Sequence, residues 1–367
     1  MAAALSTTAV ALRRRPAVAA EIALLGIGTV GGALLDRLAR LDGRIPPLRL
    51  VHVANSRGAV VGGDGIDAAS ARARLADDAR DASDPLHAFD GRVPAIVVDA
   101  SGSEAIAACH ARWLARGVHV VTASKLGQGA GLDRWRAIRE ACTRAGTHYG
   151  DAATVGAGLP LLRSLRALRD GGDAITSIAG VLSGSLAWLF GEYDGLRPFS
   201  GFVRTARDCG YTEPDPREDL SGEDVRRKLL ILARTAGFPL ERDDVHVESL
   251  VHVHLAALPR DGVDASLPML DEVMRERFAA AYRHGERLRH VARLEVADGR
   301  ISARVGPESL APDDPLAPGR GTDNRVAIRC DRYDGQPLLI QGPGAGGGVT
   351  AAALLDDVLA IVRDASC

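Results

Sequence analysis

One acidic and one basic side chain stand a single helical turn apart in the second half of the chain. Asp224 and Lys228 fall in a stretch whose apolar residues Val225, Leu229 and Leu232 recur at helical spacing, so both polar side chains share one helix face. The carboxylate can orient the ammonium, and the ammonium can stabilise a developing oxyanion or supply a proton. A surface ion pair worth a few tenths of a kcal/mol fits the same spacing.

A loop rich in carboxylates leads into this helix. It begins at Gly210 and contains Pro214 and Pro216, which should prevent a regular helix until after Asp219. Ser221 or Gly222 can then cap the helix that follows. We therefore expect the chain to pass from loop to helix just before Asp224.

A second candidate site lies near the N-terminus. Gly26, Gly28 and Gly31 form G-x-G-x-x-G between an apolar strand-like run and a helical pattern. Such glycines allow a tight turn and let a pyrophosphate approach the helix N-terminus, where free N–H groups favour negative charge. A purely structural turn is the alternative.

The end of the next predicted strand bears on the choice of cofactor. Asn55, Ser56 and Arg57 follow it, with no acidic residue to bind the ribose 2′-hydroxyl of NAD. An arginine there suits the 2′-phosphate of NADP. NAD remains an alternative, and Arg57 is then a solvated loop cation.

The elements around the glycine motif predict an α/β fold. Strands are expected at 48–54, 95–99 and 118–122, and helices at 33–41, 103–116 and 133–145. This alternation implies a parallel sheet, so we predict a Rossmann-type nucleotide-binding domain over residues 21–150.

A second domain of α+β type is predicted over residues 151–337. It contains a helix near 161–168 and hairpin strands around a turn at Asp298-Gly299. The last segment, 338–367 with a helix at 350–362, is expected to complete the nucleotide domain. The second domain should bind the substrate and form the contact of a homodimer, the latter by analogy.

Composition argues against several classes of function. The formal net charge is −2 with no long basic run, so nucleic acid is not an expected partner. The five cysteines form no C-x-x-C, which argues against a disulfide framework or zinc site and favours a reducing cytoplasm. Cys209 is expected to pack, and His246, His252 and His254 to line a strand or loop.

Residues 1–20 are rich in alanine, with Arg13 to Arg15 and no acidic residue. We expect a flexible leader, with a transit peptide as the alternative. No apolar stretch reaches the roughly 18 to 20 residues that a membrane span requires. A membrane protein is therefore not expected.

Five stretches carry a more specific signal when they are taken together. They are Val120 to Lys125, Val155 to Pro160, Gly180 to Leu186, Gly210 to Arg234, and Gly342 to Ala352. The chain resembles homoserine dehydrogenase in these stretches and, with few interruptions, from Glu21 to the C-terminal helix. The nearest resemblance is to the dehydrogenase half of the bifunctional aspartokinase/homoserine dehydrogenases.

The resemblance implies a reaction and a catalytic centre. The reaction is the reversible, NAD(P)H-dependent reduction of L-aspartate 4-semialdehyde to L-homoserine, in threonine and methionine biosynthesis. Asp224, Lys228 and Lys125 match the family's catalytic positions. We expect Lys228 to be the main acid and base with Asp224 orienting it, while Lys125 is the other candidate.

The same resemblance assigns residues that bind the two small molecules. Glu213 should hold the substrate's ammonium, with Asp219, Gly210 and Tyr211 in the same site. Together with the glycine motif, it predicts NADP contacts at Gly26, Gly28, Thr29, Val30, Gly31, Asn55, Arg57, Ser101, Lys125 and Gly344.

Two departures from the family pattern concern the loops near the site. Ala123 and Ser124 replace the usual Pro and Asn before Lys125. The family often binds a monovalent cation such as Na⁺ through carbonyls that match Val155, Ala157 and Leu159, plus an acidic side chain. That acidic position is Ala152 here, and the adjacent Asp151 is out of register.

Two rival functions remain. An oxidoreductase of the same fold acting on another small amino or hydroxy acid would keep the glycine motif, but would not need Glu213, Asp219 and Lys228 together. A catalytically silent NADP sensor or scaffold would need neither Asp224 nor Lys228. The sequence favours the dehydrogenase over both.

Overall fold

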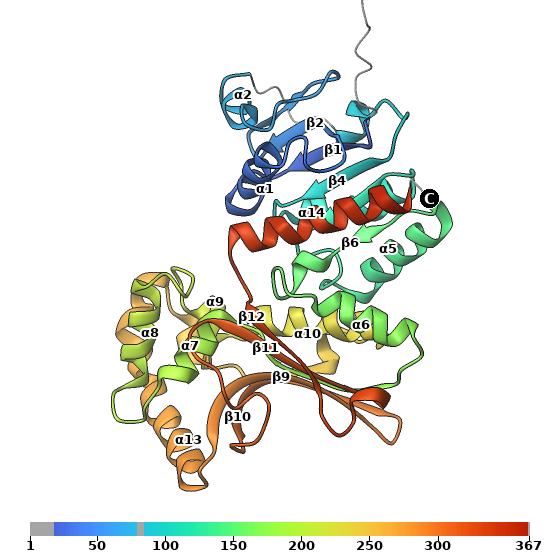
Figure 1. Ribbon diagram of the computed structural model, residues 1–367. Coiled ribbons are helices and arrows are strands. Elements are labelled where there is room, and N and C mark those ends of the chain that lie inside the picture. The colour runs from blue at the N-terminus through green and yellow to red at the C-terminus, as the bar shows by residue number, and fades with distance from the viewer. Residues whose placement is uncertain (1–17, 79–83, 366–367) are drawn as a thin grey trace, which may run out of the picture.

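The computed structural model describes residues 18–78 and 84–365. They form two sheets, each covered by helices, stacked along the long axis of the molecule (Figure 1). Residues 1–17 of the predicted leader lie outside the described residues. The predicted α/β fold class is confirmed, with a Rossmann-type sheet followed by a second unit of α+β type.

The first sheet has the strand order β3-β2-β1-β4-β5-β6. This is the order of a doubly wound nucleotide-binding sheet. All its strand pairs are parallel except β2 with β3. The strands are β1 (Ala20–Leu25), β2 (Leu48–Asn55), β3 (Gly58–Val61), β4 (Ala95–Asp99), β5 (His119–Thr122) and β6 (Tyr149–Gly150).

Alternation along β1 shows why this sheet needs helices on both faces. Ile22 and Leu24 belong to a buried cluster with helices α1 and α14, whereas Ala23 and Leu25 join a cluster with α4 and α5. A parallel strand buried on both faces is a nearly continuous apolar run, and the one charged residue of β1, Glu21, pairs with Arg49. The helices are α1 (Thr29–Arg40), α2 (Ala71–Asp77), α3 (Glu104–Ala107), α4 (His110–Leu114), α5 (Leu132–Ala145) and α14 (Gly347–Asp364).

Two local features of this half differ from the predictions. The helix expected over 103–116 is divided into α3 and α4, because the Cys109 N–H bonds to the Ile106 carbonyl three residues back and tightens the turn there. Strand β3 was not predicted. The Asn55 side chain folds the chain back by accepting hydrogen bonds from the Arg57 and Gly58 amides at 2.8 and 3.2 Å.

The second sheet has the order β12-β11-β7-β9-β10-β8, antiparallel except between β8 and β10. The predicted turn at Asp298-Gly299 joins β9 to β10, with φ of 51° and 72°. The strands are β7 (Ile175–Val181), β8 (Val245–Val247), β9 (Arg287–Ala297), β10 (Arg300–Leu310), β11 (Asp323–Cys330) and β12 (Leu338–Pro343).

Helices α6 and α10 lie between the two sheets (Figure 1). Helix α10 packs against both β9 and α6, so its inner face is buried while its N-terminal turn remains accessible. The helices of this half are α6 (Leu161–Asp170), α7 (Gly184–Glu192), α8 (Phe199–Asp208), α9 (Arg217–Leu220), α10 (Glu223–Ala236), α11 (Val253–Ala257), α12 (Val263–Ser266) and α13 (Asp271–Arg283).

One predicted boundary is wrong. Residues 338–343 were expected to rejoin the nucleotide domain, but they form β12, which pairs with β11 in the second sheet. The pairing is favoured because both are extended segments whose backbone groups bond to each other over six residue pairs. The chain returns to the first sheet only with α14, which packs beside α1.

Candidate active site

A polar cavity of about 460 Å³ lies at the N-terminal end of α10. Lys125 reaches it from the loop after β5, and most of the other lining residues come from 213–227. The lining is strongly charged: Lys125, Ser183, Glu213, Glu218, Asp219, Ser221, Glu223, Asp224, Val225 and Arg227. Charge of both signs thus surrounds one small volume.

Asp224 lines the cavity and contacts both lysines, of which Lys125 also lines the cavity and Lys228 lies behind Asp224, outside the described lining. Asp224 Oδ2 lies 2.9 Å from Lys228 Nζ and Asp224 Oδ1 lies 3.4 Å from Lys125 Nζ. Lys228 also donates a hydrogen bond to the Leu182 carbonyl oxygen at 2.8 Å. Helix α10 sets this arrangement, because it places Asp224 and Lys228 one turn apart. The helix begins directly after Gly222, a residue whose own backbone is in the left-handed conformation.

The charges in this cluster change one another's proton affinity. Burial opposes ionisation of Asp224, but the neighbouring Lys228 and Lys125 ammonium groups lower its pKa to about 2. Burial also lowers the pKa of Lys125, helped by the nearby cations Lys228 and Arg227, although Asp224 opposes the shift. Asp224 is therefore an anion at neutral pH, while Lys125 releases its proton more readily than an ordinary lysine.

The lowered pKa of Lys125 can be measured directly, because only two of the 45 lysine and arginine residues of the chain are lysines. Protein labelled with ¹³C in its lysine side chains should give two Cε signals. We expect the Lys125 signal to titrate below the pKa of an unperturbed lysine, about 10.4. An Asp224→Asn variant should titrate lower still, since the opposing anion is lost. A Lys125 pKa at or above the ordinary value would contradict this prediction.

Two serines at the start of α7, the capping residue Ser183 and Ser185, hold Asp219 of the cavity. Ser185 Oγ donates to Asp219 Oδ1 at 2.6 Å, and Ser183 Oγ lies 2.8 Å from Ser185 Oγ. The other Asp219 oxygen accepts the Glu213 amide at 2.8 Å. Asp219 thus fixes the backbone that carries Glu213. Helix α9 begins directly after Pro216, earlier than predicted, because proline is tolerated before the first turn.

Two of the predicted substrate residues are not brought into this cavity. Gly210 follows α8 with φ of 72° and ends that helix. The Tyr211 ring is 43% exposed and lies 5.5 Å from the Trp188 ring. Neither is among the described residues that line the cavity.

The glycine motif forms a tight turn at the carboxyl ends of β1 and β4. Gly26 has φ of 89°, and a Cβ there would lie 2.7 Å from the Ser101 Cα atom. A Cβ on Gly31 would overlap the Gly26 carbonyl oxygen, whereas one on Gly28 would meet no atom within 4 Å. Helix α1 starts at Thr29, so the first N–H groups, those of Thr29, Val30 and Gly31, have no partner within the helix. Open space before a free helix N-terminus fits a pyrophosphate.

Substitutions at Gly31 and Gly28 should therefore affect different properties, stability for Gly31 and dinucleotide binding for Gly28. Gly31→Ala should lower the free energy of unfolding by about 1–3 kcal/mol through overpacking against backbone. Gly28→Ala should leave thermal stability unchanged but weaken dinucleotide binding, because its methyl group enters the space a phosphate would occupy. Thermal denaturation and nicotinamide fluorescence titration test the pair. Unchanged affinity in Gly28→Ala would contradict the placement of the phosphate.

The other predicted cofactor residues are dispersed around this turn. Asn55 uses its side chain to build the β2–β3 turn, and the Arg57 side chain is exposed beside it. Ser101 donates to Asp99 Oδ1. Gly344 packs so tightly against Asn324 that a Cβ would overlap its side chain.

The loop predicted to hold a cation offers main-chain oxygens only. Both carboxylate oxygens of Asp151 are engaged, one by Arg166 and the other by Gln128 Nε2 at 2.6 Å. The Leu159 carbonyl already accepts the Leu161 amide at 2.8 Å. With Ala152 at the acidic position, the loop supplies no carboxylate to balance a cation.

Sequence reasoning assigned no role to Ser183, Ser185 or Arg227. Ser183 caps α7, accepting the Leu186 amide, and Arg227 lies on the same face of α10 as Asp224 and Lys228. A serine before a helical pattern, such as Ser183, is a capping signal, but the bond between Ser185 and Asp219 spans 34 residues of sequence.

The histidines and the helices of the described part of the chain add no further site. No group of three or more His, Cys, Asp or Glu side chains there could hold a metal ion. His252 caps α11 and His246 lies in β8. Within residues 18–78 and 84–365, no helix is both long enough and apolar enough to cross a membrane.

Comparison with protein families gives two adjacent matches. A family model described as homoserine dehydrogenase matches residues 160–359. Another, described as the NAD binding domain of homoserine dehydrogenase, matches residues 26–150. The first match contains the cavity residues from Ser183 to Arg227, and the second contains the glycine turn and Lys125.

Individual relatives agree with these matches. The chain is 40% identical over 349 residues to bifunctional aspartokinase/homoserine dehydrogenase 2 of Escherichia coli, covering 92% of this chain and 42% of that protein. It is 34% identical over 365 residues to homoserine dehydrogenase of Emericella nidulans, covering 93% and 98%. A solved putative homoserine dehydrogenase from Archaeoglobus fulgidus superposes with a TM-score of 0.75 at 25% identity, covering 93% and 98%. The chain thus spans less than half of the bifunctional relative.

Proposed function

This chain belongs to the homoserine dehydrogenase family of NAD(P)-dependent oxidoreductases, and we propose that it reduces L-aspartate 4-semialdehyde to L-homoserine. One observation carries the proposal. Both lysines of the chain lie within 3.4 Å of the same carboxylate, Asp224, and Asp224 lines a cavity together with Lys125 and four other carboxylates. Although Arg227 also lines the cavity, both cations that contact Asp224 are lysines, the basic side chain that can release a proton.

The two lysines would act on the substrate's carbonyl oxygen. A reduced nicotinamide, when bound at the glycine turn, supplies a hydride to the carbonyl carbon. Lys228 donates to the oxygen that becomes negative, first stabilising it and then giving it a proton. Asp224 and the Leu182 carbonyl fix the direction of the Lys228 ammonium. Lys125 is placed to share this role.

The acidic wall would hold the other end of the substrate. Glu213 and Asp219 line the cavity beside Glu218 and Glu223, and their negative charge favours an ammonium group. Because Asp219 is tied to Ser185 and to the Glu213 amide, the carboxylates are oriented before the substrate arrives.

Glu213→Ala should raise the KM for L-homoserine by about 10- to 100-fold, because a charge-assisted hydrogen bond worth about 1.5–3 kcal/mol is lost. The KM for the cofactor should not change. Absorbance of the reduced nicotinamide gives both constants. The control is Glu295→Ala, an exposed glutamate of β9, which should behave as the wild type. A normal homoserine KM in Glu213→Ala would remove this residue from the site.

Initial rates with each cofactor and with homoserine analogues test the proposed activity itself. We expect NADP to be preferred over NAD, since the exposed Arg57 follows β2 and no carboxylate stands in that turn. Turnover of another hydroxy acid in preference to homoserine would favour the rival oxidoreductase. Nucleotide binding without turnover in either direction would favour the silent sensor.

Three further expectations depend on solution measurements. We propose a homodimer from the family resemblance and a cytoplasmic location from the cysteine pattern. Light scattering tests whether the protein is a dimer.

A monovalent cation at Val155, Ala157 and Leu159 remains a prediction with an incomplete ligand set, and none of the catalytic roles given above depends on it. Rates in Na⁺, K⁺ and tetramethylammonium at equal ionic strength test it, and equal rates would contradict it.

A further inference from the structure

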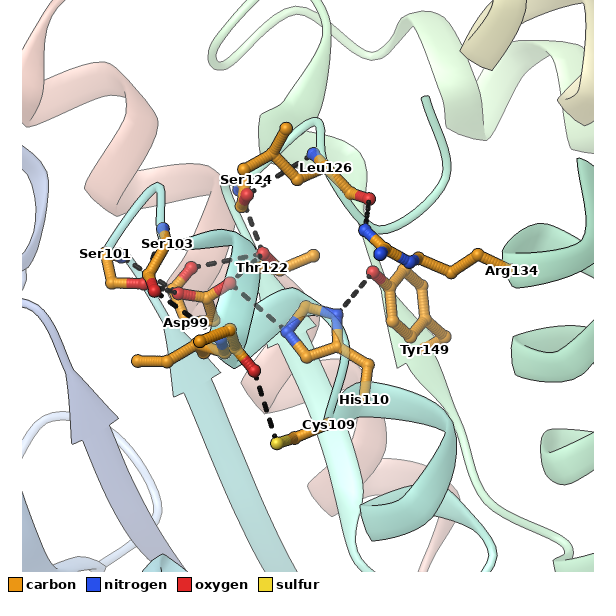
Figure 2. Close-up of polar contacts among 12 residues, drawn as sticks. Asp99, Ser101, Ser103, Cys109, His110, Thr122, Ser124, Leu126, Arg134 and Tyr149 are labelled. Atoms are coloured by element: carbon orange, nitrogen blue, oxygen red, sulfur yellow. Dashed lines mark hydrogen bonds and ion pairs between the residues drawn. The ribbon is translucent and has the colours of Figure 1, made fainter. Parts of the chain in front are cut away.

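Asp99 is a completely buried carboxylate at the carboxyl end of β4. Figure 2 shows it in a polar network that extends to Ser101 and Ser103 on one side and to Thr122 and Ser124 on the other. It is not among the described residues that line the charged cavity. A buried charge is costly unless several hydrogen-bond donors bind it. The donors that bind Asp99 therefore show which parts of the chain it holds in place.

One set of donors belongs to the loop beside the glycine turn. The Ser101 amide and hydroxyl donate to Asp99 Oδ1 at 2.9 and 2.6 Å. Ser101 Oγ in turn accepts the Ser103 amide at 3.1 Å. The Ser101 backbone packs against Gly26 with no room for a side chain. The position of Asp99 is therefore transmitted to the first glycine of the nucleotide motif.

The other set leads to Lys125. Thr122 Oγ1 lies 3.2 Å from both Asp99 Oδ2 and the Asp99 carbonyl oxygen, so its hydroxyl donates to Asp99, and it accepts the Ser124 amide at 2.9 Å. Ser124 Oγ then accepts the Leu126 amide at 3.3 Å, and Arg134 donates to the Leu126 carbonyl at 2.9 Å. These bonds fix the residues on both sides of Lys125, as Figure 2 shows. Ser124, one of the departures from the family pattern, is thus part of the support.

His110 and Tyr149 form a third part of the network, in which Tyr149 bonds to His110 and His110 bonds to Asp99. Burial raises the pKa of Tyr149 well above its ordinary value, so its hydroxyl stays protonated and can donate to His110 Nδ1 at 2.9 Å. His110 Nε2 then carries the proton and donates to Asp99 Oδ2 at 3.2 Å. Although burial opposes it, His110 and Ser101 lower the pKa of Asp99. The carboxylate therefore stays ionised and keeps all its donors.

We propose that Asp99 is a positioning residue that couples the nucleotide loop at Ser101 to the Lys125 loop through Thr122. This inference rests on the proposed function, because it takes Lys125 to act at the reacting carbonyl. Asp99 touches neither small molecule in this scheme. It sets the separation between the seat of the nicotinamide nucleotide and one of the two ammonium groups.

Two variants separate the branches of the network. Thr122→Val keeps the shape of the side chain but removes the hydroxyl that links Asp99 to the Ser124 amide, and it leaves the bonds to Ser101 intact. We therefore expect kcat to fall about 10- to 100-fold while the Kd for NADPH stays unchanged. Asp99→Asn disturbs the bonds to Ser101 as well as the bond to Thr122. We expect a similar loss in kcat together with about tenfold weaker NADPH binding. The control is His119→Gln, which changes the amino end of β5 and should alter neither quantity.

A double-mutant cycle tests whether the effect passes through Lys125. In a Lys125→Ala background, Thr122→Val should lower kcat by less than about threefold, because the group it positions is gone. An equal loss in both backgrounds would overturn the proposal and leave Thr122 a merely structural residue. An unchanged kcat in Thr122→Val alone would overturn it as well.

A readout without turnover distinguishes this inference from the proposed function. The Ser124 and Leu126 amides should exchange hydrogen faster in Thr122→Val, and the ¹³C signal of Lys125 should shift while that of Lys228 does not. If the wild type binds NADPH but does not oxidise homoserine, the proposed function fails, and these signals still test the coupling. Equal exchange and unchanged lysine signals would overturn it.

Discussion

Replacing Lys228 with alanine should lower kcat for homoserine oxidation by about 10²- to 10⁴-fold, the range that a positioned acid or base contributes. The Lys228 side chain is 14% exposed and is held by Asp224 and the Leu182 carbonyl, so alternative groups cannot easily take its place. The cofactor KM should stay the same, because the glycine turn is untouched. Initial rates from the reduced nicotinamide absorbance give both constants.

Lys228→Arg is the matched control for this prediction. It keeps a positive charge near Asp224 but cannot release a proton at working pH. If Lys228 transfers the proton, the arginine variant should be almost as impaired as the alanine variant. If the site needs charge alone, arginine should restore much of the rate. A kcat within threefold of wild type in Lys228→Ala would move the catalytic role to Lys125.

Arg234→Met should lower the free energy of unfolding by about 3–5 kcal/mol, a loss that single substitutions seldom exceed. The Arg234 side chain is completely buried on α10, and it donates to the carbonyl oxygens of Gln128, Ala130 and Leu240 at 2.5–3.1 Å. Methionine fills much of the volume but leaves these oxygens without a donor, at about 1–3 kcal/mol each. Urea denaturation measures the change.

Arg169→Met provides the comparison for Arg234. Arg169 also donates to a main-chain carbonyl near the end of α10, that of Thr235 at 2.7 Å, but its side chain is 30% exposed. Water can replace the lost donor, so we expect a loss below about 1 kcal/mol. Equal losses in the two variants would show that burial of Arg234 does not determine its contribution.

Local patterns predicted the elements that depend on neighbouring residues. The strand, glycine turn and start of α1 follow from the spacing of Gly26, Gly28 and Gly31, and the hairpin follows from Asp298-Gly299. The same holds for the meeting of Asp224 with Lys228, since one helical turn fixes their distance. These features need no knowledge of distant parts of the chain.

Features that depend on distant segments were missed or misplaced. The strand 338–343 has the apolar pattern of either sheet, and its partner β11 decided the outcome. Asp99 meets Thr122 across 23 residues and Ser185 meets Asp219 across 34, distances at which spacing carries no signal. The Asn55 side chain forms the adjacent turn, because a local hydrogen bond is available there, and its predicted contact with the nucleotide stays a prediction.

The position of α14 has a consequence for how this polypeptide folds. Leu354, Leu355 and Val358 of that helix belong to the same buried cluster as Ile22 and Leu24 of the first strand. During synthesis the second sheet can assemble while one side of the first still lacks its cover. Contacts of such long sequence separation form late and slowly. Ribosome-bound chains ending before residue 347 should therefore be protected from proteolysis in their second half before their first.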